Sequence, residues 1–245
     1  MRILTRDEES NHIFTVGSDW RGGFSYSYNW YCRNRTGVEQ IPSGDEICKR
    51  CYCLGAFNPN GEHVREFVER HELSFGEDDY EKFLNKIDAV YIASPHETHY
   101  EYAKSALKHG KHVLCEKPMV FKRAQAEELF ELARAQKCVL MEAIKTAYCP
   151  GFNQLITVAQ SGVIGEIRDV EASFSRITSP ALREMADARY GGAFTEFGSY
   201  TLLPILKLLG REYRDIRFDS ILNSNGIDGY TKASFIFDGR LAEKK

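Results

Sequence analysis

Residues 88–118 read DAVYIASPHETHYEYAKSALKHGKHVLCEKP and contain two apolar runs separated by an amphipathic segment. The run at 89–93 is nearly continuous, as expected for a parallel strand that is buried on both faces. Residues 98–109 place apolar side chains on one helical face and stop at Gly110, a common residue at helix C-termini. The second run, at 112–115, predicts another strand. The stretch therefore has the strand–helix–strand pattern of an α/β domain.

The same alternation continues on both sides of this stretch. Upstream, an apolar run at 53–57 ends in the turn-forming sequence NPNG, and residues 64–71 carry apolar side chains at helical spacing. Downstream, 124–136 predicts a longer helix and 138–141 a further strand. Strands that alternate with helices in this way indicate an open, mainly parallel sheet with right-handed crossovers.

The pattern changes after about residue 145. Helices are predicted at 152–160 and 194–209, each followed by a glycine-containing stop. The segments 170–174, 216–218 and 233–237 alternate apolar and polar residues, as strands with one buried face do. This half therefore predicts an α+β domain with a mainly antiparallel sheet.

Two domains follow from these patterns, one at 1–144 and one at 145–245. The first 52 residues are atypical, because they are polar, aromatic and Arg-rich without a sustained helical period. Residues 13–16 predict one short strand there. The second domain is expected to be incomplete, with a sheet that offers an edge for a homodimer.

Composition excludes several classes of protein. The 245-residue chain has a formal net charge of −3 with both signs interspersed, which argues against a nucleic-acid-binding face. No apolar run reaches the length of a membrane helix, and the N-terminus lacks a signal-peptide core. The seven cysteines are odd in number and irregularly spaced, so free thiols in the cytoplasm are expected. Cys48, Cys51 and Cys53 lack the second ligand pair of a structural zinc site, so no metal is expected.

Ligands of open parallel sheets bind beyond the carboxyl ends of the strands. Asn58, residues 94–96 and residues 116–118 directly follow three predicted strands, so their side chains should converge on one crevice. Most lysines are solvated surface charges, but Lys117 follows a buried strand and precedes a proline. A lysine held in such a crevice is able to exchange a proton with a substrate hydroxyl group.

Five segments together resemble the Gfo/Idh/MocA oxidoreductases, which include glucose–fructose oxidoreductase, inositol dehydrogenase and dihydrodiol dehydrogenase. The segments are ASPH with its preceding strand (89–96), Thr98-His99, GKHVLCEKP (110–118), SGVIGEI (161–167) and GGAFTEFGSY (191–200). The likeness extends from about Cys53 to Phe237, and the joint occurrence of the motifs is far more specific than any one of them.

This resemblance implies a Rossmann domain that binds NAD or NADP and a second domain that shapes the substrate site. It implies hydride transfer at a secondary alcohol carbon of a sugar, cyclitol or diol. Lys117 would be the acid/base group, Tyr200 the second proton-handling group, and Glu196 would stand at the usual Asp position. Cofactor contacts are expected from Asn58, Ser94, Pro95, His96, His99, Glu116 and Lys117, and substrate contacts from Lys145 and Tyr148.

Plainer interpretations of the same residues stay open. His96 and His99 are suited to capping the helix after Pro95, and Tyr200 is suited to a helix core. The pair Gly191-Gly192 is also compatible with an ordinary loop before a helix.

Two departures from the family pattern favour a second hypothesis. A dinucleotide fold needs a Gly-rich turn after its first strand, and the nearest substitute, 17–23, has the wrong spacing. Asn58 replaces the acidic residue expected at the adenosine ribose. The chain also ends earlier than family members do, so we expect a gene fragment or an altered reading frame before about Cys53. The alternative function is therefore a non-catalytic or cofactor-deficient relative that acts in binding or dimerisation.

Overall fold

The computed structural model describes residues 12–16 and 53–237, except for 166, 168, 178–184 and 186. The chain divides into two compact units, Met1–Ala143 and Ile144–Lys245. The candidate zinc cysteines Cys48 and Cys51 and the candidate phosphate turn at 17–23 lie outside the described residues.

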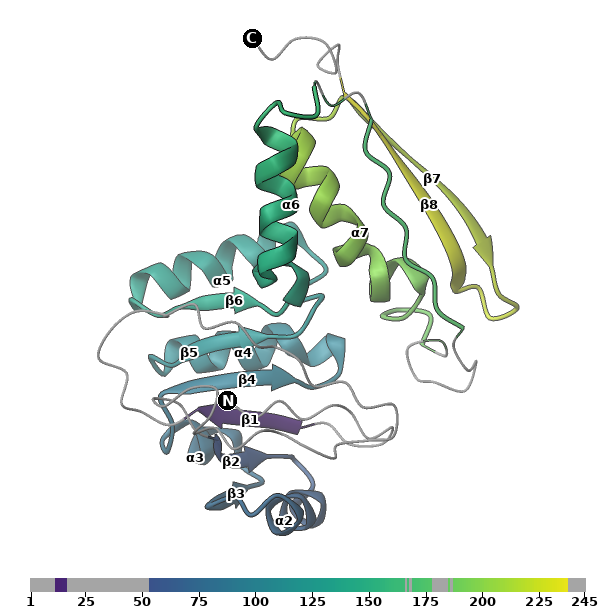
Figure 1. The fold of residues 1–245 in the computed structure, drawn as a ribbon. Coiled ribbons are helices and arrows are strands. Elements are labelled where there is room, and N and C mark those ends of the chain that lie inside the picture. Colours follow the sequence, from purple (N-terminus) through teal and green to yellow (C-terminus); the bar gives the residue numbers. More distant parts are fainter. Residues whose placement is uncertain are drawn as a thin grey trace. The chain divides into compact units, whose positions relative to one another are not determined.

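The N-terminal unit is built on one six-stranded sheet, whose order is β3-β2-β1-β4-β5-β6 (Figure 1). This is the strand order of doubly wound dinucleotide-binding sheets, in which the order reverses between the first and fourth strands. The strands are β1 (His12–Val16), β2 (Cys53–Phe57), β3 (Phe75–Glu77), β4 (Ala89–Ala93), β5 (His112–Cys115) and β6 (Leu140–Glu142).

Strand β1 confirms the short strand predicted at 13–16, but its direction differs from that of a wholly parallel sheet. It pairs antiparallel with both β2 and β4, so His12 lies opposite Ala93 and Val16 opposite Ala89 (Figure 1). The chain therefore leaves β1 at the edge where β4 begins. In a dinucleotide fold the first strand ends at the opposite edge, because its Gly-rich turn has to reach the pyrophosphate there. The sheet is accordingly mixed.

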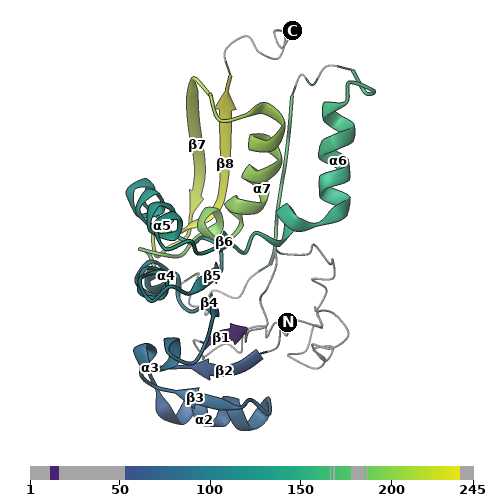
Figure 2. The same cartoon turned by 90° about the vertical axis from the view of Figure 1, so that its left-hand side faces the viewer.

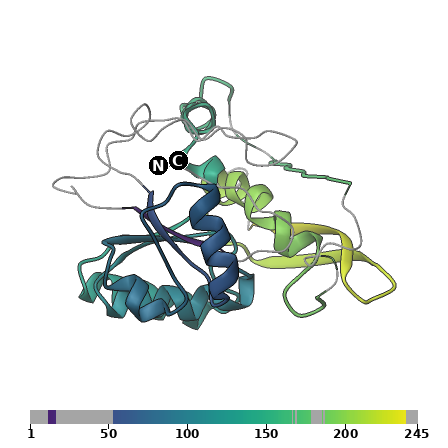
Figure 3. The same cartoon turned by 90° about the horizontal axis from the view of Figure 1, so that it is seen from below.

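Helices cover both faces of this sheet. The two faces are set by the two-residue period of the strands: Val90 and Ile92 of β4 enter one buried cluster, and Tyr91 enters the other. Helix α2 (Gly61–Arg70) covers the Tyr91 face. Helices α3 (Tyr80–Leu84), α4 (His99–Lys108) and α5 (Arg123–Ala135) supply the other cluster, and α4 and α5 lie side by side on that face (Figure 3). The prediction of a strand buried on both faces is confirmed.

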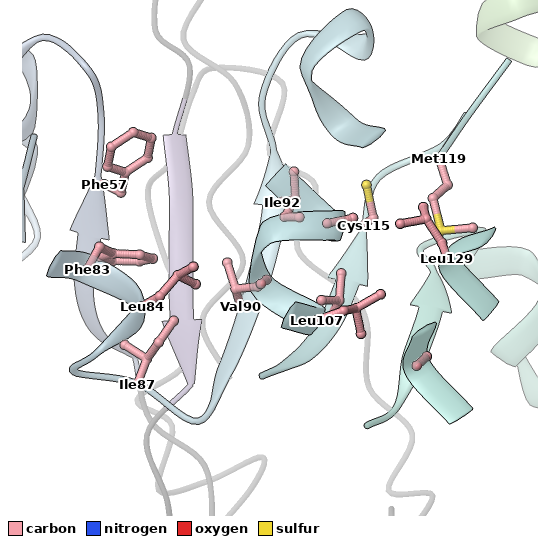
Figure 4. Close-up of a cluster of buried hydrophobic side chains, with 14 residues drawn as sticks. Phe57, Phe83, Leu84, Ile87, Val90, Ile92, Leu107, Cys115, Met119 and Leu129 are labelled. Atoms are coloured by element: carbon pink, nitrogen blue, oxygen red, sulfur yellow. The ribbon is translucent and has the colours of Figure 1, made fainter. Parts of the chain in front are cut away.

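The larger cluster forms the core of the N-terminal unit (Figure 4). Phe83 and Leu84 of α3 are fully buried in it, as is Leu107 of α4. Phe83 lies among aromatic rings, with its centroid 5.9 Å from that of Phe57 and 6.1 Å from that of Phe75. This packing holds Phe57, the last residue of β2, in the core.

The C-terminal unit contains two long helices and an antiparallel hairpin (Figure 2). Its elements are the 3₁₀ helix η2 (Lys145–Tyr148), α6 (Pro150–Gln160), α7 (Ala193–Leu209), β7 (Asp215–Leu222) and β8 (Asp228–Ile236). Helix α7 packs beside β8, and the hairpin confirms the antiparallel sheet predicted from 216–218 and 233–237.

The strand predicted at 170–174 is wrong, since this segment has no strand pairing among the described residues. Instead, the ring of Phe174 stacks on Phe197 of α7, with centroids 4.6 Å apart and planes 14° from parallel. Side-chain stacking on a helix, rather than a backbone ladder, accounts for the apolar residue at this position.

The N-terminus of α7 requires a glycine at 192, and replacing it by alanine should destabilise the C-terminal unit. Gly192 has φ of +118°, and an added Cβ would come 2.0 Å from Oδ1 of Asp228. The same carboxylate accepts the Phe194 N–H at 2.8 Å through Oδ2. Gly192→Ala should lower the free energy of unfolding by more than about 1 kcal/mol in urea titrations. The matched change Gly151→Ala meets no atom within 4 Å and should have little effect; equal losses would contradict this role for Gly192.

The expectations about membrane helices, metal sites and cysteines can be compared with the described residues. Within the described residues, no helix is both long and apolar enough to span a membrane. In the same part of the chain, no three His, Cys, Asp or Glu side chains gather into a possible metal site. Cys115, Cys138 and Cys149 are free thiols, in line with the expectation.

Candidate functional site

The predicted crevice residues follow strands that end at one edge of the N-terminal sheet. Ile92 of β4 lies beside Cys115 of β5 in a parallel pair, and Cys115 in turn lies beside Glu142 of β6. Strands β2 and β4 are both antiparallel to β1 and therefore run in the same direction. The residues after β2, β4 and β5 thus begin at the same edge, as the sequence predicts.

Asn58, after β2, is buried at 3% exposure and shapes its own turn. Its Oδ1 atom accepts the Asn60 N–H at 2.8 Å, and its backbone N–H donates to the Glu77 carbonyl at 3.2 Å. Asn60 then caps α2 by accepting the N–H of Glu62. The side chain at the position predicted to face the ribose is therefore a neutral amide, and it also orders the loop.

The loop after β4 is held by its own hydroxyl groups. The Ser94 and Thr98 hydroxyls lie 2.5 Å apart, and the Thr98 hydroxyl donates to the Pro95 carbonyl at 2.7 Å. His96 is half-buried, with its ring centroid 6.2 Å from that of Phe121. Neither His96 nor His99 caps helix α4, because α4 has no side-chain cap.

His99, the first residue of α4, is fully buried. Its Nε2 atom lies 2.8 Å from the Ser94 carbonyl oxygen and its Nδ1 atom 2.9 Å from the Pro118 carbonyl oxygen. Burial lowers the pKa of His99 to about 4, although the two carbonyls oppose this shift. The ring is therefore neutral near pH 7, and its direct contact with a cofactor stays a prediction.

Lys117 is half-buried and lies in a segment that neighbouring side chains hold by its backbone. The Glu116 carboxylate accepts the Tyr91 hydroxyl at 2.5 Å and the Lys117 N–H at 3.2 Å. One residue beyond the cis Lys117–Pro118 peptide, the Met119 N–H donates to Oε1 of Glu142 at 2.8 Å. The position of Lys117 is thus set from β4 and β6 as well as from its own strand.

Two carboxyl groups with different environments flank Lys117. Burial raises the pKa of Glu142, and the Glu116 carboxylate raises it further. The Met119 N–H and the Lys117 charge act in the opposite direction and favour the ionised form. A titratable group shifted by burial and specific neighbours at a sheet edge is typical of a functional site.

Sequence reasoning missed Tyr91 and Glu142 as members of this site. The signal for Glu142 was available, because it follows the strand predicted at 138–141 and the carboxyl-end rule applies to it as well. Tyr91 lies inside an apolar run, and nothing in that pattern shows that its hydroxyl group reaches the end of the neighbouring strand.

The remaining predicted site residues belong to the C-terminal unit. Glu196 and Tyr200 are half-buried on α7, one helical turn apart, and Oε1 of Glu196 is shielded from solvent. The Tyr200 ring stacks on Phe174, with centroids 5.6 Å apart. Lys145 is exposed and Tyr148 half-buried, and both lie in η2. The pairing of these residues with Lys117, which belongs to the N-terminal unit, stays a prediction.

A family model described as "Oxidoreductase family, NAD-binding Rossmann fold" matches residues 34–144. Among curated proteins, the chain is 31% identical over 193 residues to scyllo-inositol 2-dehydrogenase (NADP(+)) of Bacillus subtilis, covering 75% of this chain and 58% of that protein. It is 36% identical over 158 residues to dTDP-3,4-didehydro-2,6-dideoxy-alpha-D-glucose 3-reductase of Actinomadura kijaniata, covering 62% and 46%.

Among solved structures, the chain resembles a 3-ketoreductase from Actinomadura kijaniata in complex with TDP-benzene and NADP, in its open conformation. The TM-score is 0.60 at 31% identity, and the match covers 74% of this chain and 55% of that one. The chain spans about half the length of the curated relatives it matches.

Proposed function

Because this chain belongs to the Gfo/Idh/MocA family of oxidoreductases, whose model describes an NAD-binding Rossmann fold, we propose that it is an NAD(P)-dependent oxidoreductase. The proposed reaction transfers a hydride to or from a secondary alcohol carbon. The observation that carries this proposal is the placement of Lys117 at the carboxyl edge of the sheet, within a segment fixed by Tyr91 and Glu142.

The proposed substrates are sugars, cyclitols or related diols. Two relatives support this class, because one is named for scyllo-inositol and the other for a dideoxy sugar carried on dTDP. Both names describe a ring with a secondary alcohol or ketone. The choice among such substrates depends on the C-terminal unit, where Lys145 and Tyr148 are the proposed substrate contacts.

The described residues fit one end of a nicotinamide cofactor. Ser94, Pro95 and His96 follow β4, and Glu116 lies directly before Lys117 after the neighbouring strand β5. They offer the polar groups expected at the nicotinamide side. Strand β1 ends at the other edge of the sheet, and the candidate pyrophosphate turn at 17–23, which follows it, lies outside the described residues. When bound, the nicotinamide supplies the hydride donor or acceptor.

The residues of this chain would handle the proton and the orientation of the substrate. Lys117 exchanges a proton with the reacting oxygen of the substrate. General acid/base catalysis requires the bound substrate to place this oxygen within hydrogen-bond distance of the Lys117 ammonium group. Tyr200 is proposed as the second proton-handling group, with Glu196 beside it on α7. Asn58 carries no charge, so it leaves the site open to a cofactor with a 2′-phosphate as well as to NAD.

The reversed direction of β1 favours one rival function. A chain with an antiparallel β1 and without a recognised pyrophosphate turn would be a cofactor-deficient relative. It would act as a binding protein or form a homodimer through the C-terminal hairpin. The two functions differ in cofactor affinity, which makes binding the first property to measure.

Fluorescence titration with NADH and NADPH tests the proposed function. Binding should enhance or shift nicotinamide fluorescence, with NADPH bound at least as tightly as NADH because Asn58 does not repel the 2′-phosphate. The absence of binding of either cofactor up to millimolar concentration would favour the cofactor-deficient rival. ATP serves as a control for binding through the adenosine half alone.

A further inference from the structure

His99 occupies a position that neither helix capping nor apolar packing explains. The imidazole ring is fully buried, and both nitrogens face backbone carbonyl oxygens on different segments. One carbonyl belongs to Ser94, directly after β4, and the other to Pro118, directly after Lys117. Burying polar nitrogens has a free-energy cost unless hydrogen bonds replace water, so this arrangement depends on the bonds that His99 makes.

The segment next to His99 is the one that carries Lys117. Glu116 fixes the amide on one side of Lys117, and Glu142 fixes that of Met119 on the other. Between them, Pro118 has no N–H to donate, so its carbonyl group is the backbone polar atom through which it can be held. The contact from His99 is made to that atom.

We propose that His99 is a positioning residue that donates its Nδ1 proton to the Pro118 carbonyl and so holds Lys117 at the sheet edge. The inference rests on the proposed function of Lys117 as the acid/base group. His99 would not touch the substrate; it would act by keeping the backbone on the C-terminal side of Lys117 tied to α4.

The protonation state limits what this ring can do. A neutral imidazole has one N–H, and a carbonyl oxygen only accepts, so at any moment a single one of the two contacts is a hydrogen bond. The tautomer with the proton on Nδ1 ties down the Lys117 segment. The tautomer with the proton on Nε2 bonds instead to Ser94, five residues back in the same loop, and leaves Pro118 unheld.

Two substitutions separate these alternatives. In His99→Asn the amide nitrogen stands near the former Nδ1 and can still donate to Pro118. In His99→Gln the amide reaches the former Nε2 position and faces Ser94. His109→Gln is the matched control, because His109 is an exposed histidine at the end of the same helix with Nδ1 2.9 Å from the Ser105 carbonyl.

Amide hydrogen exchange and steady-state kinetics give independent readouts. In His99→Gln, exchange at Lys117 and Met119 should accelerate relative to β4 and β5, and kcat should fall by up to about 100-fold, as for a misplaced catalytic group. KM for the cofactor should stay within about twofold, because the substitution is expected to displace Lys117 without removing a group that binds the cofactor in the ground state. His99→Asn should recover most of both losses, and the control should match the unsubstituted protein.

Equal behaviour of the Asn and Gln variants, or unchanged local exchange in His99→Gln, would overturn the proposal. Faster local exchange with unchanged kcat would also overturn it, while leaving the function of the chain intact. If the unsubstituted protein neither binds cofactor nor turns over, the proposed function fails, and exchange alone decides whether His99 holds the segment. ¹⁵N NMR of the unsubstituted ring gives a check without any variant: a proton on Nδ1 supports the proposal and one on Nε2 contradicts it.

Discussion

Replacement of Lys117 by alanine is expected to reduce kcat by about 10²- to 10⁴-fold, the usual contribution of a general acid/base group. The loss follows because Lys117 is the proposed proton donor and acceptor, and the adjacent Glu116 carboxylate is already engaged by the Tyr91 hydroxyl and the Lys117 N–H. Affinity for the cofactor should change little, since the proposed interaction forms with the reacting oxygen. The assay would compare turnover across a panel of cyclitols and sugars.

Lys108→Ala provides the control, because Lys108 is an exposed lysine in α4. It should retain full turnover. Lys117→Arg is informative as well, since arginine keeps the charge but does not release its proton in this pH range. Full turnover by Lys117→Ala, measured on protein that is folded by circular dichroism, would remove Lys117 from the mechanism.

Phe83→Ala should lower the free energy of unfolding of the N-terminal unit by about 3–5 kcal/mol, the range for truncating a buried aromatic residue. Phe83 has 0% exposure and belongs to the buried cluster of Figure 4. Its ring centroid lies 5.9 Å from that of Phe57, 6.1 Å from that of Phe75 and 6.0 Å from that of Tyr80. The cavity would lie under the end of β2 and beside α3, where surrounding side chains are already closely packed. Urea unfolding followed by circular dichroism measures the loss.

Phe130→Ala makes the same chemical change at a position of 43% exposure on α5. Its effect should stay well below that of Phe83→Ala, because less apolar area leaves water on folding at that site. If the two variants lost similar amounts of unfolding free energy, the cluster around Phe83 would not be the main source of stability of the N-terminal unit.

Local pattern was sufficient to predict most of the N-terminal unit. The pattern of residues 88–118 predicted the strands β4 and β5 and the helix between them, because a near-continuous apolar run and a helical period have distinct spacings. The same spacing rule placed α5 and α7 within one residue of their observed starts. The family resemblance then predicted which of the strand-end residues carry chemistry.

Features that depend on distant parts of the chain could not be read in this way. The direction of β1 is set by its pairing with β2 and β4, which lie far along the sequence, and an apolar run is the same in both directions. The strand predicted at 170–174 failed for a similar reason, since alternation predicts a buried face but does not supply a partner strand. The contacts of the His99 ring with the Ser94 and Pro118 carbonyl oxygens join two loops that only the folded sheet brings together.

The central claim is that the carboxyl edge of the N-terminal sheet binds the nicotinamide cofactor, and backbone amide NMR tests it most directly. On addition of NADPH, the largest chemical-shift changes should occur at Ser94, His96, Glu116 and Lys117. Saturating NADPH that leaves these amides unchanged, or that shifts instead those of Ala89 and His112 at the opposite ends of β4 and β5, would contradict the claim.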